Sequence, residues 1–359
     1  MKLQQLEYLS AVVRSDLNVS AAARRLHTSQ PALSKQIRQL EEELGTRIFL
    51  RQARQFTGLT AAGQQIVRHA LSILREARYI EGMAAELRHD DSGELSIGTT
   101  HTQARYVLPH ILRQFSEAYP RIRLHLHQGT AEQIAEMVRA DVVDLAMATG
   151  SRDLFPKWVL LPCYQWHRCL IVPRGHRLAG VETVTLRDLA NHPLITYAFS
   201  FSGPSALQST FADAGLKPQI ALTAWDADVI KTYVRQGLGV GMIAEMALDS
   251  SEDADLVRLE IAHLFQPHQT WIGFPRHALL RQYAYRLLSL IAAHLDQATV
   301  QKAESCADQL GVDALFAKLV LPGPGSFRSS EPVNHSGSAP HEADLLSVNA
   351  KADVTAALT

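Results

Sequence analysis

Amide, hydroxyl and cationic side chains recur between residues 30 and 38 at a spacing that one helical face would share. Gln30 and Ser34 lie one turn apart, and Lys35 and Arg38 follow on the same side. Amide and guanidinium groups can donate to the edges of bases, and cations can pair with phosphates. This set therefore predicts recognition of double-stranded DNA through the major groove.

Two short helices joined by a tight turn are expected to present these groups. Ser20 is expected to cap a first helix over residues 21–26, after which the chain turns at His27 and Thr28. Ser29 should cap a second helix, with Pro31 in its first turn, where a missing N–H costs nothing. The second helix should bury an apolar stripe made of Leu33, Ile37, Leu40 and Leu44. From the pattern alone, an ordinary helical hairpin with a solvated face remains the alternative.

A second polar set predicts a site for a small anion. Thr99, Thr100, Thr102 and Gln103 occupy the junction between an expected strand and the helix after it, where free N–H groups and the helix dipole favour negative charge. Thr149 ends another expected strand. We expect Ser202, in the turn FSFSG, to close from the opposite side. Ordinary helix capping is the alternative for these hydroxyls.

Alternating strands and helices from residue 93 onward are expected to position the second set in an α/β architecture. A first series of strands is expected at 95–98, 122–127 and 145–148, and a second at 169–173, 194–197, 219–223 and 240–243. A strand at 269–274 and a helix at 279–295 should follow, and that helix should return to the first lobe. Two lobes of this kind form a cleft between them.

Residues 60–90 predict one long helix, capped by Thr60, that brings two chains together. Large and small apolar residues alternate at steps of four and three, as in a seam between two close helices. The seam consists of Ile66, Ala70, Ile73, Ala77, Ile80, Ala84 and Leu87. A dimer also suits DNA recognition, because one helix-turn-helix reads only a half-site. The alternative is an amphipathic helix lying on its own domain.

The distribution of charge along the chain is consistent with a DNA-binding amino-terminal region followed by a region with another role. Residues 1–60 carry nine Lys and Arg against five Asp and Glu, so they have a charge of +4 within a chain of 359 residues whose total is −1. The three cysteines are widely spaced, which fits neither a disulfide framework nor a zinc module. No apolar leader or run of about eighteen apolar residues is present. We therefore expect a cytoplasmic protein without a membrane association.

Two motifs in the amino-terminal region resemble the winged helix-turn-helix of LysR-type transcriptional regulators. They are SQPALSKQI at residues 29–37 and LTAAG at residues 59–63. The resemblance implies that the second helix enters the major groove, that residues 51–59 form the wing, and that the protein works as an activator with RNA polymerase as a partner. The DNA contacts implied or suggested by position are Ser20, Thr28, Ser29, Gln30, Pro31, Ser34, Lys35, Arg38, Arg51 and Arg54.

Three further motifs resemble the members of this family that regulate sulfur assimilation and cysteine biosynthesis. They are TTHTQARY at 99–106, LPCYQW at 161–166 and DADVIKTYVRQGLGVG at 226–241. The resemblance implies an effector such as acetylserine, sulfate or thiosulfate in the cleft. The implied contacts are Thr100, Thr102, Gln103, Thr149, Trp166 and Ser202, the last at a position where the family has Thr.

The expected architecture is an all-α winged helix-turn-helix at residues 1–59, a linker helix at 60–90, a two-lobed α/β effector domain of periplasmic-binding-protein type at 91–322, and a disordered tail at 323–359. The expected assembly is a homodimer or homotetramer on DNA, with a small anionic effector. Regulation of sulfonate use or of an unrelated pathway is the alternative function.

An enzyme or a solute-binding protein on the same fold is a more distant alternative. We identify no poised nucleophile and base, and no cofactor site. Gly237, Gly239 and Gly241 follow an expected helix and precede a strand, the reverse of a dinucleotide motif. His125 and His127 share a strand face but have no carboxylate or Cys at ligand spacing, so no metal is expected.

Overall fold

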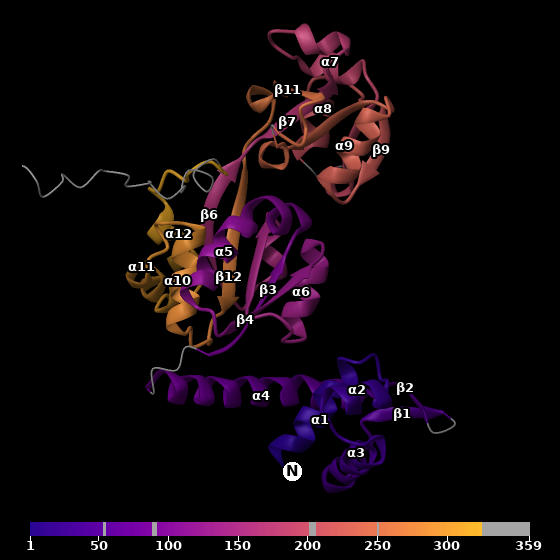
Figure 1. Ribbon diagram of the computed structural model, residues 1–359, viewed down its shortest axis with the longest axis vertical. Helices are drawn as coiled ribbons and strands as arrows, with labels where there is room; N and C mark the ends of the chain where they lie inside the picture. The colour runs from indigo at the N-terminus through magenta and orange to yellow at the C-terminus, as the bar shows by residue number, and fades with distance from the viewer. Residues whose placement is uncertain (53–54, 88–91, 201–205, 250, 325–359) are drawn as a thin grey trace, which may run out of the picture.

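The computed structural model describes residues 1–52, 55–87, 92–200, 206–249 and 251–324. Figure 1 shows a small head, a long helix, and two lobes stacked above that helix. No helix in the described part of the chain is long and apolar enough to span a bilayer.

The head is a three-helix core with a β-hairpin wing. Its elements are α1 (Leu3–Val13), α2 (Val19–Arg25), α3 (Gln30–Leu44), β1 (Phe49–Gln52) and β2 (Gln55–Leu59). Leu33, Ile37 and Leu40 are fully buried in its core, as expected, but Leu44 is 38% exposed at the end of α3. The expected cap of the first helix was wrong: the side chain of Asn18, not Ser20, accepts from the N–H of Ala21, and Ser20 is exposed.

Helix α4 (Ala61–Leu87) begins directly against the wing. The Thr60 hydroxyl accepts from the N–H of Gly63 at 2.8 Å, which confirms the expected cap. A Cβ added at Gly63 would lie 2.1 Å from the carbonyl oxygen of Ile48, so the glycine of the LTAAG motif allows the helix to approach β1. This close approach couples the wing to the long helix.

Lobe 1 is a five-stranded sheet in the order β4-β3-β5-β12-β6. β3 pairs in parallel with β4 and β5, whereas β12 is antiparallel to both its neighbours. Its strands are β3 (Gly93–Thr99), β4 (Ile122–Gln128), β5 (Leu145–Thr149), β6 (Trp158–Trp166) and β12 (His268–Pro275). Its helices are a π-helical turn at Gln103–Val107, α5 (Leu108–Ala118), α6 (Ala131–Arg139), α10 (Gln282–Ile291), α11 (Gln297–Glu304) and α12 (Gln309–Phe316). Helix α10 packs against α5, which confirms that the chain returns to the first lobe.

Lobe 2 is a second five-stranded sheet in the order β11-β7-β10-β8-β9. Its strands are β7 (Arg168–Pro173), β8 (Leu194–Tyr197), β9 (Ile220–Ala224), β10 (Val240–Ala244) and β11 (Leu256–Glu260). Its helices are α7 (Leu186–Ala190), α8 (Ala206–Asp213) and α9 (Ala227–Arg235), with 3₁₀ turns at Arg177–Gly180, Ala198–Ser200, Glu245–Ala247 and Ala262–Leu264. The passages from β6 to β7 and from β11 to β12 connect the two lobes (Figure 1).

Some expectations fall at the limits of the described chain. Nearly all of the expected tail at 323–359 lies outside the described residues. Residues 319–322 run beside lobe 1, where the N–H of Gln165 donates to the carbonyl of Pro322 at 3.0 Å. Two short helices, α11 and α12, follow the helix expected at 279–295, and α12 packs on β6.

Candidate functional site

Helix α3 presents its amino-terminal half to solvent. Ser29 accepts from the N–H of Ala32 at 3.3 Å and Pro31 lies in the first turn, so both local expectations are confirmed. Gln30, Lys35 and Arg38 are exposed, and α3 lies on the side of the head away from the lobes (Figure 1). Thr28 and Ser34 are half-buried beside them. The face predicted for the groove is therefore accessible.

The wing is held to α3 by a buried carboxylate that the sequence did not reveal. Glu41 is 7% exposed, and its Oε1 accepts from the N–H groups of Ile48 and Phe49 at 2.8 and 3.2 Å. Its other oxygen pairs with Arg51, whose guanidinium also lies over the ring of Phe56. Arg51 is thus engaged within the head, which argues against its predicted role as a free phosphate contact. Arg54 lies outside the described residues.

Three of the predicted effector residues converge at the edge of lobe 1 nearest lobe 2. Gln103 is buried, accepts from the hydroxyl of Tyr164, and donates to Thr270 at 3.5 Å. The hydroxyls of Thr149 and Thr270 lie 2.9 Å apart. The indole of Trp166 donates to Thr149 at 3.3 Å. Gln103, Thr149 and Trp166 therefore belong to one hydrogen-bonded network, to which sequence reasoning had not assigned Tyr164 or Thr270.

The remaining predicted positions differ in what the structure shows. Thr102 is half-buried, and its side chain lies near enough to the Tyr197 hydroxyl of lobe 2 to oppose the burial that raises the pKa of that phenol. Thr100 is half-buried at the carboxyl end of β3. Ser202 lies outside the described residues. Tyr164 lies within the LPCYQW motif, which was the one signal in the sequence for its role. Thr270 is one of three polar residues at the start of β12, and nothing in the sequence distinguished it.

Several buried polar atoms at the facing edges of the lobes have no hydrogen-bond partner among the described residues. They are Thr99 Oγ1, His101 Nδ1, His167 Nδ1 and Arg168 Nη1. Buried polar atoms in proteins are nearly always paired, so each exception requires an explanation. These four atoms lie on segments at which the two lobes meet.

An ionic contact joins the lobes beside this site. The Tyr106 hydroxyl donates to Asp228 Oδ1 at 2.7 Å, and Arg105 pairs with Oδ2 at 2.9 Å. Burial alone would raise the pKa of Asp228, but the hydrogen bond from Tyr106 and the charges of Lys231 and Arg105 hold it below its usual value. Asp228 is therefore a carboxylate that fastens lobe 2 to lobe 1.

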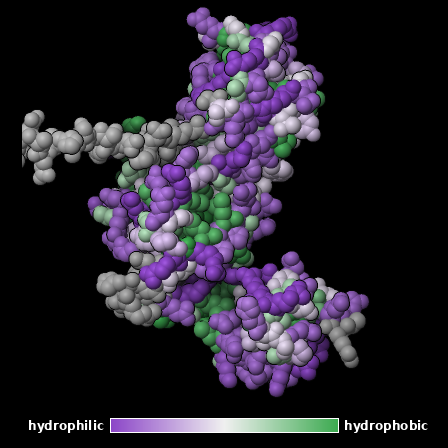
Figure 2. Space-filling model, viewed as in Figure 1, coloured by the Kyte–Doolittle hydropathy of each residue, from purple (hydrophilic) through white to green (hydrophobic). Residues whose placement is uncertain are grey.

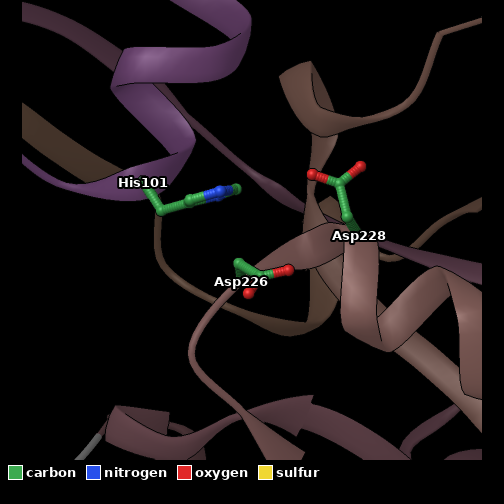
Figure 3. Close-up of side chains that lie close together, drawn as sticks. All are labelled: His101, Asp226 and Asp228. Carbon is green, nitrogen blue, oxygen red and sulfur yellow. The ribbon is translucent and has the colours of Figure 1, made fainter. Parts of the chain in front are cut away.

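His101 points from lobe 1 toward Asp226 and Asp228 of lobe 2 (Figure 3). Potential ligand atoms of the three lie within 4.8 Å of one another, a grouping the sequence did not predict. The carboxylate of Asp228 already pairs with Arg105 and Lys231, and that of Asp226 caps α9 by accepting from Val229 at 2.8 Å. Two cations at this carboxylate oppose a divalent ion, so we interpret the group as part of the contact between lobes.

Comparison with known proteins decides the family. Residues 3–64 match the model "Bacterial regulatory helix-turn-helix protein, lysR family", and residues 88–296 match "LysR substrate binding domain". The chain belongs to the LysR family.

The chain matches two named relatives over nearly the whole length of each relative. The chain is 44% identical to the HTH-type transcriptional regulator CysB of Haemophilus influenzae, over 89% of this chain and 99% of the relative. It is 43% identical to the HTH-type transcriptional regulator SsuR of Burkholderia cenocepacia, over 84% and 97%. The crystal structure of the cofactor-binding domain of the Cbl transcriptional regulator superposes with a TM-score of 0.56 at 41% identity, covering 60% of this chain and 96% of that one. These relatives are transcriptional regulators, not enzymes.

Membership of the family supports the expected architecture. The chain has a helix-turn-helix head followed by a two-lobed LysR substrate-binding domain. It is a LysR-type, DNA-binding transcriptional regulator.

Proposed function

We propose that this LysR-type regulator controls genes of sulfur assimilation and cysteine biosynthesis, and that it senses acetylserine or a sulfate-like anion between its lobes. The carrying observation is the network of Gln103, Thr149, Thr270 and Trp166, which gathers donors and hydroxyls at one edge of the cleft. The similarity of the whole chain to CysB supports a role in the sulfur pathway.

The network suits an anion that has several acceptor oxygens. The hydroxyls of Thr149 and Thr270 and the indole N–H of Trp166 carry no charge, and they could donate to such a ligand by giving up their hydrogen bonds to one another. Thr102 lies near the Tyr197 hydroxyl of the other lobe, so a ligand held beside Thr102 would respond to lobe position. A ligand regulates only by binding one arrangement better than another.

At the head, we propose that α3 enters the major groove with Gln30, Ser34, Lys35 and Arg38 facing the DNA. Lys35 and Arg38 lie on the side of α3 opposite the buried stripe, and Gln30 and Ser34 flank them toward the start of the helix. Glu41 does not repel phosphates, because it is buried and paired with Arg51. We further propose that the protein dimerises through α4 and acts with RNA polymerase as its partner.

Two substitutions test the two halves of this proposal in the full-length protein. Arg38→Ala should abolish the specific footprint on a promoter of cysteine-biosynthesis genes, since a good base contact contributes about 1 to 3 kcal/mol, and should leave ligand affinity unchanged. Thr100→Ala should keep the footprint but weaken effector binding about tenfold to a hundredfold. Thr183→Ala, an exposed position in lobe 2, serves as the control.

Calorimetry with acetylserine, sodium sulfate, sodium thiosulfate and ethanesulfonate identifies the effector class. Binding of ethanesulfonate alone would favour the sulfonate pathway, the second candidate. A parent protein that binds none of the four would contradict the proposed effector. An unchanged footprint in Arg38→Ala would contradict the groove assignment.

A further inference from the structure

Arg168 begins β7 at the edge of lobe 2 that faces the cleft. The residue is 5% exposed and lies opposite Ala244 in the sheet. Its Nε donates to His268 Nε2 at 3.1 Å, and its Nη1 has no hydrogen-bond partner. Within the described part of the chain, Arg168 takes part in no salt bridge. A buried arginine of this kind is exceptional, because buried charges are ordinarily paired.

The guanidinium is charged at neutral pH and its neighbours do not neutralise it. Burial lowers the pKa of Arg168 to about 10, still well above neutrality. Burial, together with the charge of Arg168, lowers the pKa of His268 to about 3, so this imidazole is neutral. Burial raises the pKa of Tyr197 to about 12, so this phenol is neutral as well. The positive charge is therefore uncompensated by the groups around it.

Two chains of contacts connect Arg168 to the predicted effector residues of lobe 1. On one side, the ring of His268 stacks on that of Trp166 with centroids 4.4 Å apart, and Trp166 donates to Thr149. On the other side, Arg168 and Thr102 both lie near enough to the Tyr197 hydroxyl to affect the pKa of that phenol. Arg168 is thus connected to Thr149 through His268 and Trp166, and to Thr102 through Tyr197.

We propose that Arg168 is the cationic determinant of the effector site: its buried guanidinium selects an anionic group between the lobes and ties binding of that group to the closed arrangement. The inference rests on the proposed effector cleft and adds to it a named charge, since Thr100, Thr102, Thr149 and Trp166 supply only neutral donors. An anion held nearby offsets the cost of burying Arg168, because attraction between opposite charges is strong where water is excluded. Arg168 acts on the lobes because β7 belongs to lobe 2 while His268 begins β12 of lobe 1.

The test replaces Arg168 in the full-length protein and measures sulfate binding by calorimetry. Arg168→Gln removes the charge but keeps an amide that can donate to His268, and Arg168→Lys keeps the charge. We expect the dissociation constant for sulfate to rise at least tenfold in Arg168→Gln and by less than about fivefold in Arg168→Lys. Arg168→Met is the second neutral variant if the glutamine protein does not fold.

A matched control is Arg235→Met, since Arg235 lies in the same lobe with its guanidinium paired to Asp253 and Asp255. It should lower stability without altering sulfate affinity. Thermal unfolding with and without sulfate gives a second readout. The parent and Arg168→Lys should gain stability from sulfate, and Arg168→Gln should gain almost none.

Failure of this inference is distinguishable from failure of the proposed function. If Thr100→Ala loses sulfate binding while Arg168→Gln binds like the parent and unfolds earlier with and without sulfate, Arg168 is a structural residue and the inference is wrong. If the parent binds neither sulfate nor acetylserine, the proposed effector is wrong and Arg168 loses its assigned role with it.

Discussion

At the scale of single residues, this protein buries charges where the amino-acid pattern suggests solvation. The run Glu41–Glu43 reads as an acidic helix end, yet Glu41 turns inward and ties β1 to α3. Arg168 lies in a run of strand residues and carries its charge into the interior. The burial of these two side chains cannot be predicted from residue spacing, because their partners come from other elements.

His268 should make stability depend on pH. Its folded-state pKa, about 3, lies below its usual value of 6.5, so the unfolded chain binds the extra proton between these values. The associated stability is fully present above pH 6.5 and is lost as pH falls toward 3. His268→Gln should therefore lose less stability between pH 7 and pH 5, by at most about 2 kcal/mol.

Urea unfolding at the two pH values measures this effect. His110→Gln, a substitution on the exposed side of α5, is the control. An equal loss of stability in the parent and in His268→Gln would show that His268 is protonated in the folded protein.

At the scale of elements, α4 divides into two functional parts. Ala70 is buried and Ile66 partly buried in the core of the head, so the first heptad of the expected seam packs within its own domain. Farther along, Ile73 and Ile80 are 42% and 62% exposed, and Met83 is 44% exposed. The apolar surface left for a second chain is therefore shorter than the sequence repeat indicated. In Figure 2, green patches also lie between the hydrophilic head and lobe 1.

Ile80→Asp should dissociate the dimer that we propose to form through this surface. A carboxylate in a desolvated seam has no partner, so association should weaken by at least a hundredfold. Sedimentation velocity of the full-length protein measures the change, with Glu81→Gln on an adjoining exposed face as the control. A variant that remains dimeric at the parent's concentration would place the interface elsewhere.

Helical and strand periodicity predicted most elements, and particular exceptions show where it fails. The range of β8 was predicted to the residue, at 194–197. β6 was missed because Pro162 lies within it; β6 is the edge strand of its sheet, where a proline can be accommodated. The effector network was predicted in part, since motifs identify Gln103 and Trp166 but not Thr270, which tertiary pairing alone brings to them.

At the scale of the whole molecule, cationic side chains of the head and linker contact an acidic turn of lobe 1. Arg75 of α4 pairs with the carboxylate of Asp141, and Arg14, which follows α1, donates to the carbonyl oxygen of the same residue at 3.0 Å. Asp144 lies within the electrostatic reach of Arg78. The turn lies between α6 and β5, whose carboxyl end carries Thr149, so head and cleft are linked through one short segment.

Asp141→Asn should loosen this contact without disturbing the turn, since asparagine tolerates the positive φ of 50° at this position. We expect several-fold faster amide hydrogen exchange in α4 near Arg75, and unchanged exchange in the lobe 1 sheet. The parent protein in high salt should approach the same behaviour, because salt screens the pair.

Asp153→Asn, at an exposed position in the same lobe, is the matched control. Unchanged exchange in α4 of Asp141→Asn would show that the ion pair between Arg75 and Asp141 does not hold α4 against lobe 1.

The order of the strands also governs how the chain can be built during synthesis. β12 lies between β5 and β6 in the lobe 1 sheet, but all of lobe 2 separates β6 from β12 in the chain. The ribosome therefore delivers lobe 2 before the strand that joins β5 to β6, and domains generally fold as units while they emerge. Lobe 2 can form its own sheet while lobe 1 still has unpaired strand edges, and those edges are exposed to aggregation until His268–Pro275 arrives. Lobe 2, which is inserted between β6 and β12 of lobe 1, can therefore fold first. The two lobes face each other in their final arrangement only after β12 has docked into the lobe 1 sheet.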